Sequence, residues 1–296
     1  MPTVLWPLLF GNYVIGSGVM VVAGTLNEIS ADLSVSVATA GQLISVGALV
    51  MCIGAPTLAF FVSGWDRRRL LSLSLAWFAL LLCICAFMPS YATLLPVRAL
   101  ALVAPAIFTP QATACIGLLV PLEQRGRAIS FVFLGWTLAS VLGMPMAALI
   151  GGLFGWRVAF ATVGVLAGVA AAWVWSAMPN GVRPAAMSRD AWRRTLQSPA
   201  LILTVGVTLC SSAGQFTLMA YLAPYFKQVL DASPKDLSLS FLWFGVFALL
   251  GNLLMSRFIE SVGSARGVLM SQGAIALAFV LWPLGQSWPL ALAVLA

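Results

Sequence analysis

The sequence contains no histidine, and Asp and Glu together account for only 8 of its 296 residues. Without histidine there is no imidazole to bind a metal ion or to relay protons near neutral pH. The acidic residues are not clustered, so a carboxylate metal site also lacks its ligands. These absences argue against a membrane-embedded enzyme, and we expect a protein that is not an enzyme and that holds no metal or cofactor.

Charged residues of either sign are also scarce. They make up 8% of the chain, whereas hydrophobic residues make up 61% and the mean hydropathy is +1.04. A soluble core of this size cannot hide so much apolar surface, and the surplus must face lipid. The 5 cysteines all fall within apolar runs, where thiols behave as small hydrophobic groups, so they indicate no redox compartment.

What the chain has in abundance is long apolar runs. A helix needs roughly 20 apolar residues to cross about 30 Å of hydrocarbon, and only a helix satisfies its own backbone groups there. Nine runs reach about that length, and a tenth begins at Trp288. The nine runs span residues 5–26, 41–63, 70–87, 92–120, 128–154, 158–175, 201–226, 237–255 and 268–284. The sequence therefore predicts an all-α integral membrane protein that contacts the lipid bilayer.

The basic residues gather in every second connection between these runs. Eleven of the 15 Lys and Arg residues lie there, and the other connections carry no net positive charge. The eleven are Arg67, Arg68, Arg69, Arg125, Arg127, Arg183, Arg189, Arg193, Arg194, Arg257 and Arg266. By the positive-inside rule these connections and the N-terminus are cytoplasmic. The net charge of +7 then suits anionic lipid headgroups, and no nucleic-acid partner is expected.

The composition divides the chain into two parts. Residues 177–199 are rich in proline and arginine and predict a cytoplasmic linker. It separates an N-terminal six-helix bundle, residues 1–176, from a partial C-terminal bundle, residues 200–296, with helices 7 to 9 and the start of helix 10. This position is where a two-bundle transporter joins its halves. A long loop without such a role is the alternative.

Arg98 is the one charge predicted within a membrane run. A cation at the bilayer centre costs on the order of 2.5 to 3.5 kcal/mol on insertion scales, so we expect Arg98 to face the bundle interior or a wet cavity. The alternative is that its side chain reaches outward or braces backbone carbonyls. In the fifth run, Gly135, Gly143 and Pro145 predict a bent, closely packed helix that can serve as a seal, although such residues are common in membrane helices.

Other polar residues suggest a latch and a cavity. Asp66 precedes Arg67 and Arg69 in a short turn, where a carboxylate can pair with arginine or with a helix N-terminus. A solvated basic loop is the alternative. Uncharged hydrogen-bonding residues within the runs suit a neutral or amphipathic small-molecule substrate, unless they only bond to neighbouring helices. The cavity candidates are Asn12, Gln111, Gln215 and Tyr221.

Three segments in order resemble motifs of the major facilitator superfamily, specifically its drug/proton antiporter branch with arabinose-, sugar- and purine-efflux permeases. Residues 64–71 resemble the loop motif between the second and third helices, with Asp66 and Arg67 at its acid and first arginine. Residues 94–98 resemble the fourth-helix motif, whose arginine is implicated in proton coupling, and residues 135–145 resemble the fifth-helix antiporter motif.

This resemblance implies a two-bundle transporter with six complete helices in the N-terminal half and three to four in the C-terminal half. It implies proton-coupled efflux of a small neutral or amphipathic solute, of drug, sugar or nucleoside type, by a monomer in the bacterial inner membrane. The coupling or gating residues would be Arg98, Asp66, Arg67, Arg69, Gly135, Gly143 and Pro145.

Two departures from the family pattern leave an alternative open. Val19 stands where many relatives carry an acidic residue in the first helix. The family has twelve helices, whereas this sequence ends within the tenth predicted run. The alternative is a truncated, transport-inactive membrane sensor or assembly partner.

Overall fold

The computed structural model describes residues 3–184, 197–262, 264–282 and 287–295, and every regular element within these ranges is a helix. Within these described ranges, seven helical segments are long and apolar enough to cross a membrane. They are α1 (Leu5–Gly24), α3 (Val37–Val62), α4 (Arg67–Ala86), α5 with α6 (Tyr91–Leu119), α7 with α8 (Arg125–Phe154), α9 (Trp156–Ala177) and α11 (Pro199–Val229). The predicted all-α membrane fold is confirmed.

Further helices lie between and after these spans. α2 (Leu26–Asp32) and the 3-10 turn η1 (Leu122–Gln124) lie between spans. After α11 come α12 (Pro234–Val262), α13 (Ser264–Leu281) and α14 (Trp288–Leu295). The middle of the predicted linker, residues 185–196, lies outside the described residues.

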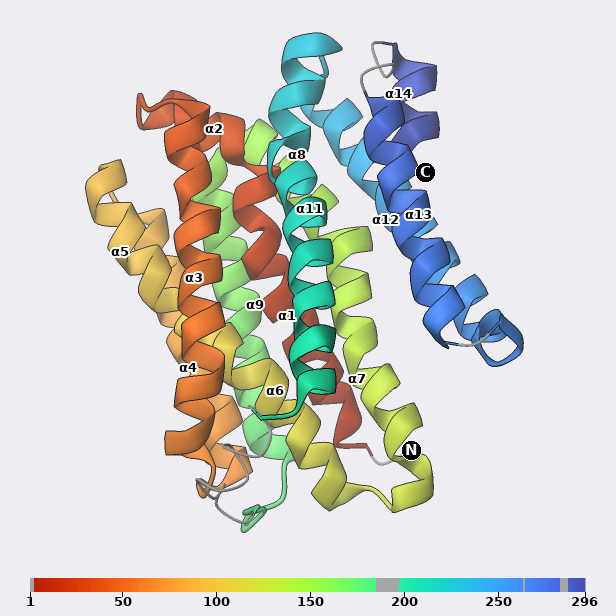
Figure 1. Ribbon diagram of the computed structural model, residues 1–296. Helices are drawn as coiled ribbons and strands as arrows, with labels where there is room; N and C mark the ends of the chain where they lie inside the picture. Colours follow the sequence, from red (N-terminus) through yellow and green to blue (C-terminus); the bar gives the residue numbers. More distant parts are fainter. Residues whose placement is uncertain (1–2, 185–196, 263, 283–286, 296) are drawn as a thin grey trace.

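α1 is the central helix of the first group of spans (Figure 1). It packs against α6, α7, α8 and α9, and most of its residues are buried. Because α1 is apolar around its whole circumference, it can be covered on all sides without leaving a polar face unsolvated. The aromatic side chains of Phe78, Phe108 and Phe160 fill the space between it and its neighbours.

Two of the predicted runs are interrupted. The fourth divides at Leu102 into α5 (Tyr91–Ala101) and α6 (Val103–Leu119), and Trp77 Nε1 donates to the Leu100 carbonyl at 2.9 Å beside the break. The fifth divides into α7 (Arg125–Leu138), a π-helical turn η2 (Ala139–Gly143) and α8 (Met144–Phe154). Pro145 has no N–H to donate into the preceding turn, which favours a wider turn at this point.

The two ends of the molecule differ in charge. Figure 1 shows the N-terminus, the α3–α4 loop, the α6–α7 connection and the start of α11 at its lower end. We term this the basic end, because it carries Arg68, Arg69, Arg125, Arg127 and Arg183. The opposite end holds α2 and the α11–α12 connection, where acidic residues outnumber basic ones.

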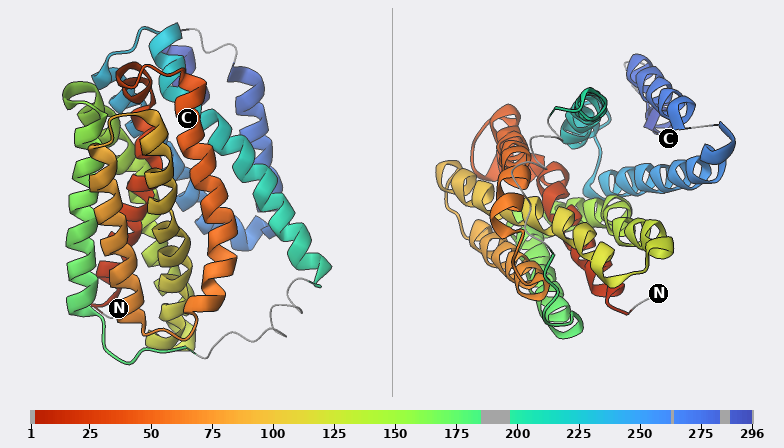
Figure 2. Two further views of the ribbon diagram at one scale, coloured as in Figure 1. Left: turned by 90° about the vertical axis from the view of Figure 1, so that its left-hand side faces the viewer. Right: turned by 60° about the horizontal axis from the view of Figure 1, so that its bottom comes forward.

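The helices from α11 onward meet the first group mainly at the opposite end. There, α12 packs against η2 and α8, and a cluster of buried side chains joins α1, α8, α11, α12 and α14. The buried residues of α11 all lie between Met219 and Phe226, whereas its first turns are exposed. The left view of Figure 2 shows α11 leaning away from α3 toward the basic end. The two groups are therefore sealed together at one end and spread apart at the other.

Candidate functional site

A cavity of about 610 Å³ lies between the two groups of helices. α1, α3, α5, α7 and α8 contribute to its wall on one side, and α11 contributes on the other. Its lining residues are Val19, Met20, Ala23, Ile44, Gly47, Ala48, Met51, Cys52, Arg98, Leu102, Trp136, Met144, Leu209, Ser212, Ala213, Phe216, Met219 and Ala220. Most of this lining is apolar, and among these described residues Arg98 is the only charged one.

The guanidinium of Arg98 is held against the backbone of α1. Its side chain is 1% exposed, and Nη2 donates to the carbonyls of Gly18 at 2.7 Å and Val19 at 3.3 Å. The charged carbon lies 5.6 Å from the centre of the Phe160 ring, which adds a weak cation–π attraction. Nε and Nη1 are buried and have no hydrogen-bond acceptor among the described residues. Arg98 therefore binds backbone carbonyls through Nη2, while the N–H groups of Nε and Nη1 have no described acceptor.

The acidic side chains that the structure describes all lie away from this arginine. Glu28 and Asp32 are in α2, Asp66 precedes α4, and Asp231 and Asp236 belong to the α11–α12 connection and the first turn of α12. None of them lines the cavity. Of the two α1 residues whose carbonyls accept from Arg98, Val19 is the one that lines the cavity. The buried cation thus has no carboxylate counter-charge among the acidic side chains that the structure describes.

Small residues bring α1 close to the fifth span. A Cβ atom added at Gly135 would lie 2.4 Å from the Leu9 carbonyl oxygen, and one added at Gly143 would lie 2.2 Å from Ser17 Oγ. Only a residue without a side chain fits this close approach between helices. The contact holds the stretch from α7 to α8 in place, and with it the side chains of Trp136 and Met144 that form part of the cavity wall.

Asp66 caps the first turn of α4 at the basic end. Its Oδ1 accepts from the Arg69 N–H at 3.2 Å, and its Oδ2 accepts from the Gly181 N–H at 2.7 Å. Desolvation acts to raise the pKa of Asp66, but the N–H groups of Arg69, Gly181 and Arg68, together with the charge of Arg183, outweigh it and lower that pKa below 3.8. The carboxylate joins the α3–α4 loop to the chain that follows α9.

Two arginines next to Asp66 strengthen the same junction. The Arg67 N–H donates to the Val182 carbonyl at 3.0 Å, and its buried guanidinium donates to the Ser63 carbonyl at 3.1 Å. Arg68 Nη1 donates to Asn180 Oδ1 at 2.8 Å. The Arg69 side chain is exposed. Asp66, Arg67 and Arg68 therefore bond to the segment that follows α9. Arg69 takes part only through its backbone N–H, which donates to Asp66.

Two of the predicted cavity residues lie within the first group of helices. Asn12 is fully buried; its Nδ2 donates to the Val132 carbonyl at 3.3 Å and its Oδ1 accepts from Thr109 Oγ1 at 2.9 Å. Gln111 is buried in α6. Neither residue lines the cavity beside Arg98. Asn12 instead hydrogen-bonds to the neighbouring helices α6 and α7, which is the alternative to a place in the cavity.

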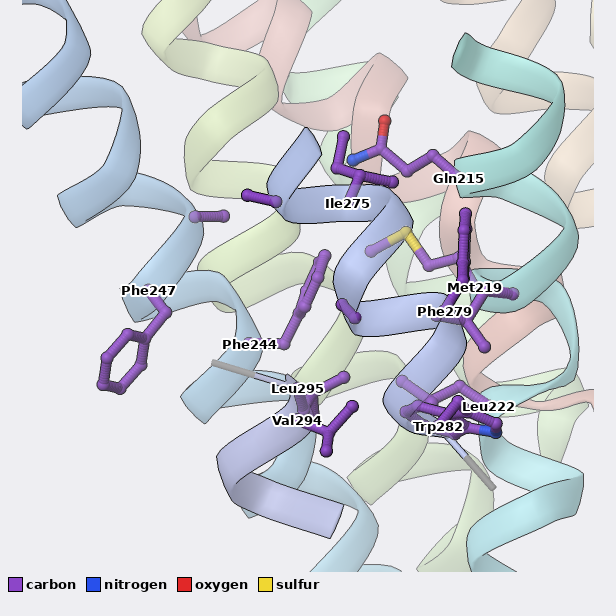
Figure 3. A pocket seen from close by; sticks show the side chains of 14 residues that line it. Gln215, Met219, Leu222, Phe244, Phe247, Ile275, Phe279, Trp282, Val294 and Leu295 are labelled. Atoms are coloured by element: carbon purple, nitrogen blue, oxygen red, sulfur yellow. The ribbon is translucent and has the colours of Figure 1, made fainter. Parts of the chain in front are cut away.

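The other two predicted cavity residues are on α11. Gln215 lines a second pocket of about 320 Å³ formed with α12, α13 and α14, where Figure 3 shows its amide beside Ile275 and above Phe279 and Trp282. Tyr221 is directed at α3, since a Cβ atom added at Gly41 would lie 2.7 Å from its hydroxyl oxygen. Tyr221 thus belongs to the contact between the two groups of helices, while Gln215 borders a separate apolar space.

Ion pairs at the opposite end were not foreseen from the sequence. Lys227 Nζ on α11 lies 3.6 Å from Glu28 Oε1 on α2, so this pair spans the two groups. Asp32 pairs with Arg157 and also accepts from Trp156 Nε1 at 3.0 Å. The hydrogen bonds from Arg157 and Trp156 lower the pKa of Asp32. The sequence does place nearly equal numbers of acidic and basic residues in the connections at this end, and that balance could have indicated ion pairs.

Comparisons with known proteins agree with this architecture. The sequence pattern of the Major Facilitator Superfamily matches residues 8–296. The chain is 31% identical to a chloramphenicol resistance protein of Streptomyces lividans, over 95% of this chain and 74% of that protein. It is 28% identical to the inner membrane transport protein YdhP of Escherichia coli strain K12, over 93% of this chain and 71% of that protein.

Solved structures show the same fold. A bacterial homologue of the human lysosomal transporter Spinster, in an inward-facing and unoccupied conformation, has a TM-score of 0.76 at 19% identity, covering 99% of this chain and 70% of that one. A D-xylose–proton symporter has a TM-score of 0.70, also at 19% identity, covering 98% of this chain and 76% of that one.

Proposed function

The chain belongs to the Major Facilitator Superfamily and is a multi-pass membrane protein, and on that premise we propose that it exports a small neutral or amphipathic solute by alternating access. The export is driven by a proton gradient across the bacterial inner membrane. The N-terminus and the linker lie on the cytoplasmic side, and the protein acts as a monomer without catalysis or a bound cofactor.

The observation that carries this proposal is the cavity of about 610 Å³ between the two groups of helices. Its volume lies within the usual range of about 300 to 1,000 Å³ for small-molecule sites. Buried packing closes it off at the opposite end, while the first turns of α11 are exposed at the basic end. A solute enters from the basic end in this conformation and leaves after the seal has moved to that end.

The relatives support efflux as the direction of transport. Besides the chloramphenicol resistance protein, a probable sugar efflux transporter of Mannheimia succiniciproducens is 25% identical over 92% of this chain and 68% of that protein. These names suggest drugs and sugars as first solutes to test. A transport-inactive sensor is not favoured, because two of these relatives are named as a transport protein and an efflux transporter.

Each predicted coupling or gating residue has a place in this mechanism. Arg98 senses the charge state of the cavity, since it is the one charged residue of the described lining. The glycines at 135 and 143, with Pro145, let the fifth span pack on α1 and shift as part of the seal. The Asp66 loop, with Arg67 and Arg69, steadies the basic end of the N-terminal bundle, residues 1–176. Residues 177–199 link it to the partial bundle of residues 200–296.

The experiment is flux through the purified chain in proteoliposomes with an imposed proton gradient, using chloramphenicol and a panel of sugars. We expect gradient-driven solute accumulation that Arg98→Ala abolishes, while Arg127→Ala, an exposed arginine at the basic end, transports like the wild type. Size-exclusion chromatography of the purified variants checks that both elute as the wild type does and are therefore folded. Absence of gradient-driven flux across the panel, or wild-type flux in Arg98→Ala, contradicts the proposal.

A further inference from the structure

We infer that the preferred solute is an amphipathic organic anion, whose carboxylate binds Arg98 while its apolar body fills the cavity between α1, α3 and α11. This inference deepens the proposed function and rests on it. It narrows the solute from neutral or amphipathic to negatively charged, and it assigns the group on the protein that recognises the charge.

The unused donors of Arg98 are the first support. An arginine carries five N–H donors, and here the two α1 carbonyls engage Nη2 only. Nε and Nη1 are buried without an acceptor among the described residues. A buried donor without a partner is costly. A carboxylate is the acceptor that matches a guanidinium best, because both groups are planar and the hydrogen bonds are charge-assisted.

The missing counter-charge is the second support. A buried cation in a low-dielectric region is stabilised most by an opposite charge close by. The described acidic side chains are all at the ends of the helices, and Val19 occupies the cavity wall beside Arg98. The protein thus provides the positive partner of an ion pair and leaves the negative partner to the solute.

The rest of the lining defines the body of that solute. Met20, Met51 and Met144 present flexible thioethers, and Trp136 and Phe216 present aromatic rings. Methionine adapts to irregular apolar shapes, and aromatic rings stack on planar groups. A hydrophilic sugar acid finds few hydrogen-bond partners on such a wall, since Ser212 is the one hydroxyl among the described lining residues. An aryl or alkyl carboxylic acid suits both the charge and the wall.

The second pocket gives an internal contrast. It is smaller, at about 320 Å³, and Gln215 is the one polar side chain among its described lining residues. Figure 3 shows aromatic and aliphatic side chains surrounding that amide. The described lining of this pocket includes no charged residue, so it offers no preference for an anion over its neutral analogue. A charge preference measured on the whole protein therefore reports on the cavity beside Arg98.

The test compares a matched pair of probes, 1-naphthylacetate and the neutral 1-naphthylacetamide, by isothermal titration calorimetry on the detergent-purified chain at pH 7.5. A charge-assisted hydrogen bond from a buried arginine favours the anion by about tenfold or more. We expect that preference in the wild type and in Arg127→Gln, and we expect it to fall below about twofold in Arg98→Gln.

Val19→Asp supplies a second variant that keeps Arg98 in place. An aspartate at this position puts a carboxylate on the cavity wall next to the guanidinium, and it should compete with the solute and abolish the preference for the anion. Val19→Asn, of the same shape without the charge, is the control and should retain the preference. The Val19 pair decides the question even where Arg98→Gln fails to fold.

The outcomes separate this inference from the proposed function. Equal affinities of the wild type for acid and amide, no binding of either, or an undiminished preference in Val19→Asp or in a folded Arg98→Gln overturns the anion site. Anion-selective binding that Val19→Asp abolishes and Val19→Asn retains supports it, even where proteoliposomes show no gradient-driven flux and the transport proposal fails. Flux of neutral solutes without any preference for the acid leaves transport standing and removes the anion site.

Discussion

At the scale of single residues, buried polar groups in the lipid-spanning part divide into those that are satisfied and those that are not. Asn12 uses both ends of its amide on neighbouring helices and so fixes their packing. Arg98 keeps two nitrogens without acceptors beside a cavity. Because an unsatisfied buried donor destabilises the structure, its persistence beside an open space favours a role in binding over a role in packing.

The charge of Asp66 makes the junction at the basic end dependent on pH. Its folded pKa lies below the ordinary 3.8, so the carboxylate contributes stability above that value, and the contribution is lost as the pH falls through the folded pKa. We expect the wild type to melt at a higher temperature than Asp66→Asn at pH 7, measured by differential scanning fluorimetry, and the gap between the two melting temperatures to narrow as the pH falls below 3.8. A gap that stays the same from pH 7 to well below 3.8 would mean that the charge is not responsible.

At the scale of elements, the seal at the opposite end depends on how closely α12 approaches the π-helical turn. A Cβ atom added at Gly245 would lie 2.4 Å from Val141 Cα and 3.0 Å from the Ser140 carbonyl oxygen. Backbone atoms cannot swing aside as a flexible side chain can. The irregular turn before Pro145 therefore packs directly against α12, and the two form one contact surface.

Gly245→Ala should loosen this seal. Overpacking of this kind costs about 1 to 3 kcal/mol, and we expect several-fold faster labelling of Cys52, which lines the cavity, by an impermeant maleimide added on the side of the opposite end. Gly251→Ala on the same helix is the matched control, because the added Cβ has no neighbour within 4 Å. Cys52→Ser identifies the labelled site. Equal labelling in the two glycine variants would contradict a seal at Gly245.

At the scale of the whole molecule, the described residues provide few polar contacts between the two groups of helices. The pair between Glu28 and Lys227 spans them at the opposite end with 3.6 Å between the charged atoms. Half of the Lys227 side chain is exposed, so the pair stabilises the closed end only weakly. Weak pairing suits a contact that must break in each cycle of alternating access.

A charge exchange at this pair tests its role. We expect Lys227→Glu, which places two acids together, to increase Cys52 labelling from the opposite end, and Glu28→Lys combined with Lys227→Glu to restore it. The coupling energy from this double-mutant cycle should be about 0.2 to 1 kcal/mol and should decrease as salt is added. Additive effects of the two substitutions, with no restoration, would show that the residues act independently.

The sequence by itself determined the membrane fold and the alternation of charge along it, because span length and loop charge are local properties that need no knowledge of neighbours. Only the tertiary structure decided which polar residues meet. Asp66 bonds to Gly181, Asn12 to Thr109, and Arg98 to the backbone of α1. In a bilayer both the lipid-facing and the buried faces of a helix are apolar, so hydropathy does not tell which face turns inward. For the same reason the cavity, with its single uncompensated arginine, could be located only after the helices had been placed side by side.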